Sequence, residues 1–328
     1  MWPAERDFTL TEGDRLIRFG PGALADAPRL LAQEGFAGYA LLTTRRAAGQ
    51  APDVAERAAV VVDVPHGQVP DAAAEVRGAV GSRPLVALGG GRVVDVAKAI
   101  GSADGLSVAT IATTLSGAEL SAHHRPLPGH EDGPRMRPAL VIADPALMAS
   151  QPTPGLAESA MNALAHALEA LYTPRANPVS EGTALEAARQ LDAGFDEEEP
   201  TRSALALGAL LAGHAMGVTG FAVHHVLSQT VVRVAGTPHG ATNAAVLPAV
   251  VPFMRPRAPR ELRLFDDAVD VDRLRAAAGN VTLAALDVDR ALLPQIAKAA
   301  AARSGDLAAT PGPPISAGDL EALLDAAF

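Results

Sequence analysis

The chain has 328 residues, of which 48% are hydrophobic and 20% charged, so it can bury a large core and suits two domains better than one. Its formal net charge is −10 and it contains no basic run, which argues against nucleic acid or an anionic membrane as a partner. The absence of cysteine excludes disulfides, thiolate metal ligands and a cysteine nucleophile, and is compatible with the cytoplasm, where we expect the protein.

The first twenty residues carry several acidic side chains and lack the apolar segment of a signal peptide. Further along the chain, the longest apolar runs, such as residues 204–213, are too short to cross a bilayer. We therefore expect a protein without a membrane-spanning segment.

The first half of the chain alternates short apolar runs with segments of helical spacing. Four runs are predicted to be strands buried on both faces: 39–43, 59–63, 85–88 and 107–111. The segments 21–34 and 70–80 between them have the period of amphipathic helices. Such alternation is typical of a parallel α/β sheet covered by helices on both sides.

A glycine-rich loop follows the third of these strands. Gly89, Gly90 and Gly91 stand between the strand and a helix that carries Asp95 and Lys98. Glycines let the backbone approach a ligand closely, and a helix N-terminus offers free N–H groups to a phosphate. The alternative is a tight turn without a ligand. The GxGxxG pattern is absent, but three glycines exceed what a turn needs, which favours phosphate binding.

Hydroxyl side chains follow two neighbouring strands. Thr113, Thr114 and Ser116 come after the run at 107–111, where they could bond phosphate or ribose, or cap the next helix. Thr43 and Arg45 follow the first strand, at the position where adenosine ribose commonly lies in such sheets. An arginine there favours a 2′-phosphate, but surface arginines are often only solvated. The sequence thus predicts a dinucleotide, NADH or NADPH.

The character of the chain changes after about Asp144. A proline-punctuated link is expected at 144–155, and 124–138 is expected to be a loop or hairpin. Helical segments then follow at 156–172, 179–193, 201–218, 221–232, 241–254 and 315–328. Ser316 and Asp319 suit the capped start of the last one. We predict an α/β dinucleotide-binding domain over 1–150 and an all-helical catalytic domain over 151–328.

The helical half contains a candidate reaction centre. Asn162 and His166 lie four residues apart and therefore share one face of a predicted helix. His225 and His239 lie in two further apolar segments. One histidine in such a context is usually packed or exposed, but three of them together favour convergence on one polar site.

These motifs carry a family resemblance. GGGRVVDVAK, TIATTLSGAE, VIADP, NALAHALEALY, HHVLSQ and TPHGATNAAVLP, in this order and approximate spacing, resemble the iron-containing (group III) alcohol dehydrogenase superfamily over almost the whole chain. The resemblance implies the dehydroquinate synthase-like fold, a homodimer, and a dinucleotide cofactor held by the glycine loop. Metal-dependent members bind a divalent ion with one Asp and three His, which correspond here to Asn162, His166, His225 and His239. The same spacing selects His225 over its neighbour His224.

Asn162 departs from that ligand set. An amide oxygen is neutral and binds a hard divalent ion more weakly than a carboxylate does. The helix and the chain's C-terminal residues are similar to the maleylacetate reductase branch, which is regarded as working without metal. This resemblance implies hydride transfer from NADH or NADPH to an anionic unsaturated keto acid, with histidines handling proton and charge. We therefore expect no divalent metal.

Other readings remain open. Gly220, Phe221, Asn243 and Gly240 depart from the maleylacetate reductase pattern, as does Arg92 after the glycines. A metal-dependent alcohol or aldehyde dehydrogenase could use His166, His225 and His239, since three imidazoles suffice for zinc. A non-catalytic binding protein or a lyase of the dehydroquinate synthase type could share the fold. The candidates for binding an anionic substrate are the arginines Arg92, Arg135 and Arg137.

Overall fold

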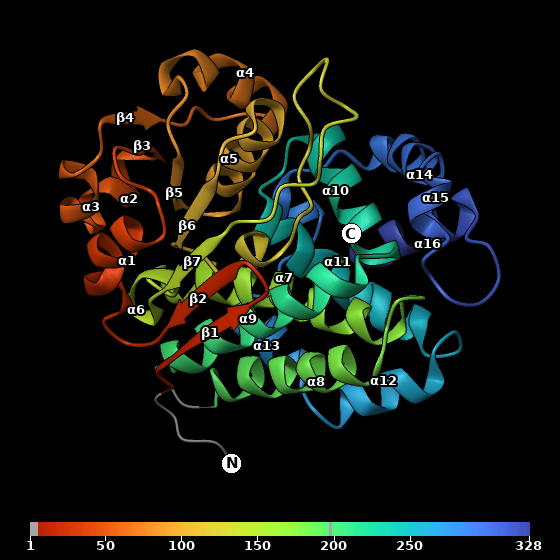
Figure 1. Cartoon of the computed structure of the whole chain (residues 1–328). Helices are drawn as coiled ribbons and strands as arrows, with labels where there is room; N and C mark the ends of the chain where they lie inside the picture. Colours follow the sequence, from red (N-terminus) through yellow and green to blue (C-terminus); the bar gives the residue numbers. More distant parts are fainter. Residues whose placement is uncertain (1–5, 197–198) are drawn as a thin grey trace. The chain divides into compact units, whose positions relative to one another are not determined.

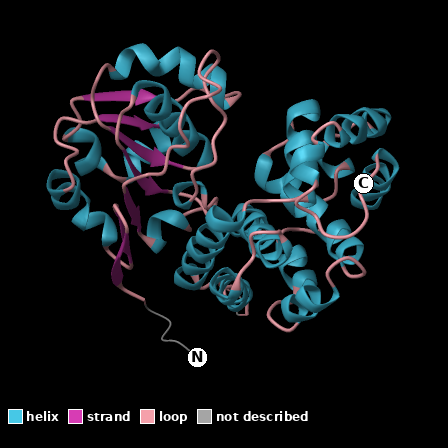
Figure 2. Ribbon diagram, turned by 45° about the vertical axis from the view of Figure 1, so that its right-hand side comes forward, coloured by secondary structure: helices cyan, strands magenta, loops and turns pink. Residues whose placement is uncertain are grey.

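The computed structural model describes residues 6–196 and 199–328. The chain divides into two compact units, Met1–Ser150 and Gln151–Phe328. Strands and helices alternate in the first unit, whereas the second unit is helical throughout its described part (Figure 2).

The first unit is built on one sheet. Its described residues form seven strands: β1 (Phe8–Glu12), β2 (Arg15–Phe19), β3 (Ala40–Thr43), β4 (Val60–Asp63), β5 (Leu85–Gly89), β6 (Val108–Ala112) and β7 (Leu140–Ala143). Their order across the sheet is β1-β2-β7-β6-β5-β3-β4 (Figure 1). β1 pairs with β2 in antiparallel orientation, and the other neighbours pair in parallel. The parallel α/β sheet predicted from the sequence is confirmed.

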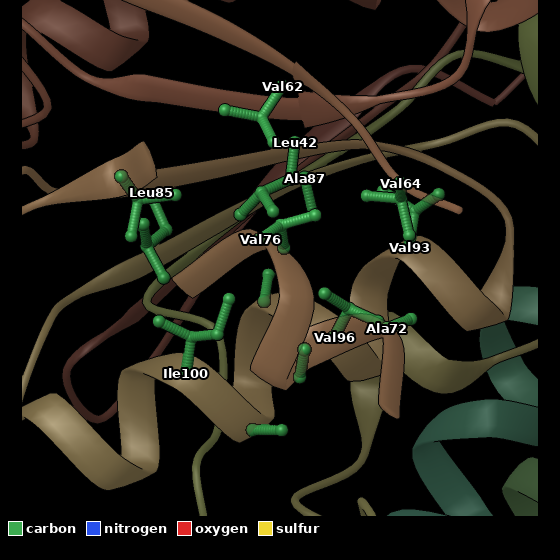
Figure 3. Packing of buried hydrophobic residues seen from close by; sticks show 14 of the residues in the cluster. Leu42, Val62, Val64, Ala72, Val76, Leu85, Ala87, Val93, Val96 and Ile100 are labelled. Atoms are coloured by element: carbon green, nitrogen blue, oxygen red, sulfur yellow. The ribbon is translucent and has the colours of Figure 1, made fainter. Parts of the chain in front are cut away.

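Helices cover both faces of this sheet. They are η1 (Ala23–Asp26), α1 (Ala27–Gln33), α2 (Arg45–Gln50), α3 (Pro52–Glu56), α4 (Val69–Val80), α5 (Gly91–Asp104), η2 (Ala118–Leu120) and α6 (Pro145–Met148). Successive strand residues face opposite sides, so Leu42 packs with α4 and α5, while Leu41 joins the core formed with α1 and α3. Figure 3 shows the α4–α5 side of this packing, where Val76 and Ile100 meet Leu85 and Ala87.

Three expectations for this unit were wrong or incomplete. β4 is not buried on both faces, because it is an edge strand that pairs only with β3, and Val61 is 49% exposed. The β1–β2 hairpin was not predicted, since its outward residues are polar and the buried face of β2 includes Arg15, which is 1% exposed. The link at 144–155 contains α6 and the first turn of the next helix.

The second unit contains the predicted helices with ends shifted by a few residues. Its described elements are α7 (Thr153–Tyr172), α8 (Pro178–Ala193), α9 (Arg202–Thr219), α10 (Val223–Ala235), α11 (His239–Met254), α12 (Pro259–Asp266), α13 (Val271–Ala277), η3 (Ala284–Leu286), η4 (Arg290–Leu292), α14 (Leu293–Ala301), α15 (Ser304–Leu307) and α16 (Ala317–Ala327). α7 is central, with α8, α9 and α11 packed around it. It is buried on nearly every side from Ala160 to Tyr172.

Two further predictions concern loops and helix starts. Residues 124–138 were expected to form a loop or a hairpin. They form an irregular loop without strands. Ser316 and Asp319 form the predicted capping box at the start of α16, each side chain accepting a hydrogen bond from the other residue's backbone N–H. Within the described ranges no single helix is long and apolar enough to cross a membrane, and α9 and α10, which pass together on length and composition, are bent by 102°.

Candidate active site

The glycine loop joins β5 to α5 in the first unit. Gly90 is the N-cap of α5 and supplies no side chain, so the first N–H groups of this helix are left for another acceptor. A Cβ atom on Gly90 would lie 2.8 Å from Cγ2 of Thr114, and one on Gly91 would lie 3.2 Å from Cβ of Ser116. The glycines are therefore required because the loop packs closely against the residues that follow β6.

The loop after β6 is held from behind by a buried lysine. Lys98 is fully buried, and its Nζ donates hydrogen bonds of 2.9, 3.3 and 2.6 Å to the backbone carbonyls of Ala118, Ser121 and His123. Its ammonium also pairs with Asp95 at 2.7 Å. Lys98 thus positions the loop, and its ammonium has no exposed surface with which to meet a cofactor. The side chain of Asp95 is 30% exposed, and its contact with the cofactor stays a prediction.

The two candidates after β3 differ in burial. Thr43 is 2% exposed and its Oγ1 donates to the carbonyl of Leu88 at 2.8 Å, so it ties β3 to β5. Arg45 is exposed at the first position of α2. Among the hydroxyl residues after β6, Thr113 is buried, while Thr114 and Ser116 line the glycine loop. Direct cofactor contact is thus more accessible to Arg45, Thr114 and Ser116 than to Thr43.

In the second unit, α7 and α10 bring two histidines together. The rings of His166 and His225 are stacked, with centroids 4.1 Å apart and planes inclined by 5°. Asn162 lies one turn before His166, and its Nδ2 is 3.5 Å from His166 Nε2. All three side chains are at least 93% buried, at exposures of 3%, 7% and 1% for Asn162, His166 and His225. The structure thus brings together Asn162, His166 and His225, whereas the predicted convergence also included His239; the roles of these residues stay predictions.

A carboxylate that the sequence reasoning missed lies behind this pair. Glu169, one turn after His166 on α7, is fully buried, and its Oε2 is 2.6 Å from Nδ1 of His225. Its Oε1 accepts backbone hydrogen bonds from His224 at 2.8 Å and from His225 at 3.3 Å. The signal in the sequence was a single acidic residue within the apolar run ALEALY, where burial demands a partner.

The ring of His224 meets the ring of His225 edge-on, with centroids 4.9 Å apart and planes inclined by 75°. Its Nε2 is 2.9 Å from Oδ1 of Asn243 on α11, and Asn243 in turn donates from Nδ2 to the carbonyl of His239 at 2.7 Å. His239 itself begins α11 and is exposed, and its charge acts on both His224 and His225. The predicted choice of His225 over His224 as the partner of His166 agrees with the ring geometry.

Burial dominates the electrostatics of this cluster. Desolvation lowers the pKa of His225 to about 3, with the charges of His239 and Arg303 acting in the same direction. Desolvation also lowers the pKa of His224 to about 3. It raises the pKa of Glu169, against the opposing effect of the backbone N–H groups that bind its carboxylate. The imidazole rings of His224 and His225 are therefore neutral at physiological pH.

The arginines predicted to bind an anionic substrate already have partners within the protein. Arg137 pairs with Glu12 at 2.7 Å, Arg135 donates to the His124 carbonyl at 3.4 Å, and Arg92 is 2.9 Å from His66 Nδ1. All three lie in the first unit. In the second unit the sequence reasoning missed Arg303, whose charge acts on His225 and whose guanidinium lies 5.9 Å from the ring centre of Phe221.

Comparison with known proteins identifies the family. Residues 18–152 match the family model "Iron-containing alcohol dehydrogenase", and residues 156–284 match "Fe-containing alcohol dehydrogenase family, C-terminal". The chain belongs to the iron-containing alcohol dehydrogenase family. The resemblance inferred from the motifs is confirmed.

Several maleylacetate reductases are similar to the chain. Maleylacetate reductase 1 of Rhodococcus opacus is 35% identical over 234 residues, which cover 63% of this chain and 64% of that protein. The match thus spans less than two thirds of that relative. Maleylacetate reductase of Burkholderia cepacia is 30% identical over 304 residues, which cover 84% of this chain and 85% of that protein.

Solved structures of the family share the fold. The crystal structure of maleylacetate reductase from Rhizobium sp. strain MTP-10005 matches with a TM-score of 0.80 and 28% identity, covering 98% of each chain. The predicted combination of an α/β sheet domain and a helical domain is confirmed as the fold of this family.

The family name implies iron, so the fit of the residues to a metal matters. Among residues 6–196 and 199–328, no three His, Asp or Glu side chains are arranged to hold a metal ion. The parallel rings of His166 and His225 direct their nitrogen lone pairs side by side instead of toward one point. Nδ1 of His225 is engaged by Glu169, and Asn162 offers a neutral oxygen. In this arrangement the residues do not fit a metal.

Proposed function

We propose that the protein is an NAD(P)H-dependent oxidoreductase that reduces an anionic unsaturated keto acid, or a related carbonyl compound, without a divalent metal. The observation that carries this proposal is the buried pair of His166 and His225 beside the neutral amide of Asn162. The family resemblance implies a carboxylate at that position in metal-dependent members. The names of the related maleylacetate reductases support the substrate class.

The first unit supplies the dinucleotide site in this proposal. The free N–H groups at the start of α5 suit a pyrophosphate, and the three glycines allow its close approach. Thr114 and Ser116 border the same loop and are placed to bond phosphate or ribose. Arg45 is exposed after β3 and would bind the 2′-phosphate that NADPH carries and NADH lacks. The proposal therefore includes both dinucleotides.

The second unit supplies the proton chemistry. Hydride transfer from the nicotinamide to an activated carbon leaves an electron pair that delocalises onto an enolate oxygen. Neutral His225 can take a proton from water at Nε2 and, as a transient imidazolium, pass it to the enolate carbon. The products are the saturated keto acid and a hydroxide that the solvent neutralises. The Glu169 carboxylate at Nδ1 stabilises the positive ring, and the side-chain amide of Asn162 can donate to developing negative charge.

An anionic substrate also needs a cation in this unit. Arg303 is the candidate, because its side chain is 19% exposed and its charge already reaches His225. Its Nε and Nη2 contact Asp306 at 3.0 and 2.9 Å, and its Nη1 donates to the Val226 carbonyl at 3.3 Å. A substrate carboxylate would therefore bind the second hydrogens of Nη1 and Nη2.

The deciding experiment is an assay of NADH and NADPH oxidation with maleylacetate, other unsaturated keto acids, enoates and aldehydes, on protein of measured metal content. We expect turnover of a keto acid by metal-free protein that a chelator does not inhibit. Stoichiometric zinc or iron with activity lost on chelation would support the metal-dependent alcohol dehydrogenase instead. Failure of both dinucleotides to bind would favour a non-catalytic binding protein. A cytoplasmic homodimer remains a prediction from the family resemblance.

A further inference from the structure

Glu169 concentrates three hydrogen bonds on one buried carboxylate. Oε1 accepts from the backbone N–H groups of His224 and His225, and Oε2 lies 2.6 Å from Nδ1 of His225. Glu169 has no exposed surface, so no solvent satisfies this carboxylate. Its position is therefore fixed by α10, although the residue itself belongs to α7.

The carboxylate also replaces a missing helix cap. The N-cap of α10 is Ala222, which has no side chain able to accept a hydrogen bond. The N–H groups of His224 and His225 belong to the first turn of α10, and Glu169 accepts both of them. The positive end of the helix dipole favours a negative charge at this place. These backbone N–H groups thus favour the ionised carboxylate of Glu169 and oppose the desolvation that raises its pKa.

We propose that Glu169 is the positioning residue of the reaction centre, holding His225 as its Nδ1–H tautomer. An ionised carboxylate can only accept, so Nδ1 must carry the proton of the neutral ring. Nε2 then keeps its lone pair, and this atom has no hydrogen-bond partner among the described residues. The result is a fixed imidazole that presents a proton acceptor to the site, stacked on His166.

The alternative placement of the proton gives the opposite tautomer. A protonated Glu169 would donate from Oε2 to Nδ1, and the ring would then carry its proton on Nε2 and could not accept one. The Tyr172 hydroxyl, whose pKa burial raises well above its ordinary value and the Glu169 charge raises further, stays neutral beside the carboxylate. Two first-turn N–H groups on Oε1 favour the anion.

The test is the tautomer of His225, measured by long-range ¹H–¹⁵N correlation spectra of histidine-labelled full-length protein. The spectrum of His225→Gln assigns the signal. We expect Nδ1–H in the parent protein and Nε2–H in Glu169→Gln. In that variant the amide oxygen can keep both backbone hydrogen bonds, while its NH₂ group faces Nδ1 and must donate. Glu186→Gln, an acid-to-amide change on α8 at 28% side-chain exposure, is the matched control and should leave the tautomer unchanged.

The kinetic consequence rests on the proposed reductase function. With the tautomer reversed, we expect kcat to fall by roughly 10²- to 10⁴-fold with little change in KM, as replacement of the orienting acid by its amide does in serine protease triads. Glu169→Asp keeps the charge and should retain more activity than Glu169→Gln. A merely structural role would lower the melting temperature without reversing the tautomer.

The outcomes separate this proposal from the proposed function. An Nε2–H signal for His225 in the parent protein overturns the assignment, even if Glu169→Gln fails to fold. A tautomer that is unchanged in folded Glu169→Gln overturns it as well. If the spectra agree with expectation but no keto acid is reduced, the positioning role of Glu169 stands and the proposed reaction does not.

Discussion

At the scale of single residues, two buried glutamates show how surroundings decide what a carboxylate does. Glu169 receives three N–H donors, which compensate for lost solvent. Glu119, in η2 of the first unit, is equally buried, but neither of its oxygens has a hydrogen bond with another described residue. Desolvation raises the pKa of Glu119 to about 7, although the charges of Lys98 and Arg15 oppose this shift. Burial thus raises the pKa of both carboxyl groups, but only that of Glu169 is opposed by hydrogen bonds from another helix.

The first prediction concerns the stability of Glu119→Gln. The unfolded chain loses the Glu119 proton near pH 4.5, whereas the folded protein keeps it until about pH 7. The unfolded state is therefore favoured increasingly as pH rises through this window, by up to about 3 kcal/mol above pH 7. Glutamine does not titrate, so it contributes no such pH dependence to the free energy of unfolding. The unfolding free energy of Glu119→Gln relative to the parent should thus increase from pH 4.5 to pH 7.5.

Urea denaturation at several pH values measures this difference. The control is Glu75→Gln, an exposed position on α4 in the same unit, for which the difference from the parent should stay flat. A flat profile for Glu119→Gln would mean that Glu119 is ionised throughout this range and is compensated by Lys98.

The second prediction concerns Asn162→Asp. Asn162 Oδ1 is buried without a hydrogen bond to another described residue, so a carboxylate there would be anionic and uncompensated. A divalent ion held with His166 and His225 would provide that compensation once the stacked rings rotate. We expect the variant to take up zinc or iron at about one equivalent per chain, and the parent to take up much less.

Metal analysis after dialysis against each ion, with isothermal titration of the same samples, measures this uptake. Asn177→Asp is the matched control, since Asn177 is the N-cap of α8 and aspartate caps a helix equally well. Equal metal content in Asn162→Asp and the parent would show that the site lacks more than one carboxylate.

The candidate residues were predictable to different degrees. The four-residue interval fixes Asn162 and His166 on one helix face, so their proximity followed from α7 alone. The stacking of His166 on His225 and the approach of Glu169 to α10 depend on how two helices far apart in the sequence pack. Periodicity carries no information on such packing, so Glu169 and Arg303 were missed. For the same reason the buried state of Lys98 was not foreseen.

At the scale of elements, local signals predicted helices better than strands. α16 was placed correctly because Ser316 and Asp319 form a local capping box that sequence alone can reveal. The β1–β2 hairpin was missed because its strands are polar, and the burial of Arg15 depends on the distant Leu120 carbonyl, to which it donates at 2.9 Å. α6 was missed because its four residues are too few to show a period.

The third prediction tests the α16 cap. In Ser316→Ala the N–H of Asp319 loses its 3.1 Å hydrogen bond to Oγ, and the reciprocal bond loses its geometric support. We expect a loss of about 1 kcal/mol in the free energy of unfolding, measured by urea denaturation. Ser304→Ala, at an exposed position beginning α15, should change it by much less. Equal effects would show that Ser316 does not stabilise α16 through its cap.

At the scale of the whole molecule, the proposed work is divided between two units. The α/β unit contains the glycine loop and the residues that support it, and the helical unit contains the histidine pair. This division was predictable because strand–helix alternation and continuous helical spacing differ strongly in sequence. Because the two sites lie in separate units, a substitution in the glycine loop should leave the tautomer of His225 unchanged.

The last prediction uses this independence and returns to the glycine loop. In Gly90→Ala the new Cβ would lie 2.8 Å from Cγ2 of Thr114, so the loop must move away from the residues after β6. We expect the affinity for NADH or NADPH to fall roughly tenfold or more, which corresponds to at least about 1.4 kcal/mol. The His225 tautomer in the helical unit should not change.

Isothermal titration with each dinucleotide measures the first effect, and the histidine spectrum measures the second. Gly78→Ala on α4 is the matched control, because no atom lies within 4 Å of its new Cβ and alanine favours a helix interior by about 0.5–1 kcal/mol. It should bind the dinucleotide as the parent does and unfold at slightly higher urea concentration. If Gly90→Ala also binds like the parent, the three glycines serve only to make a tight turn, and the cofactor phosphates must be held elsewhere.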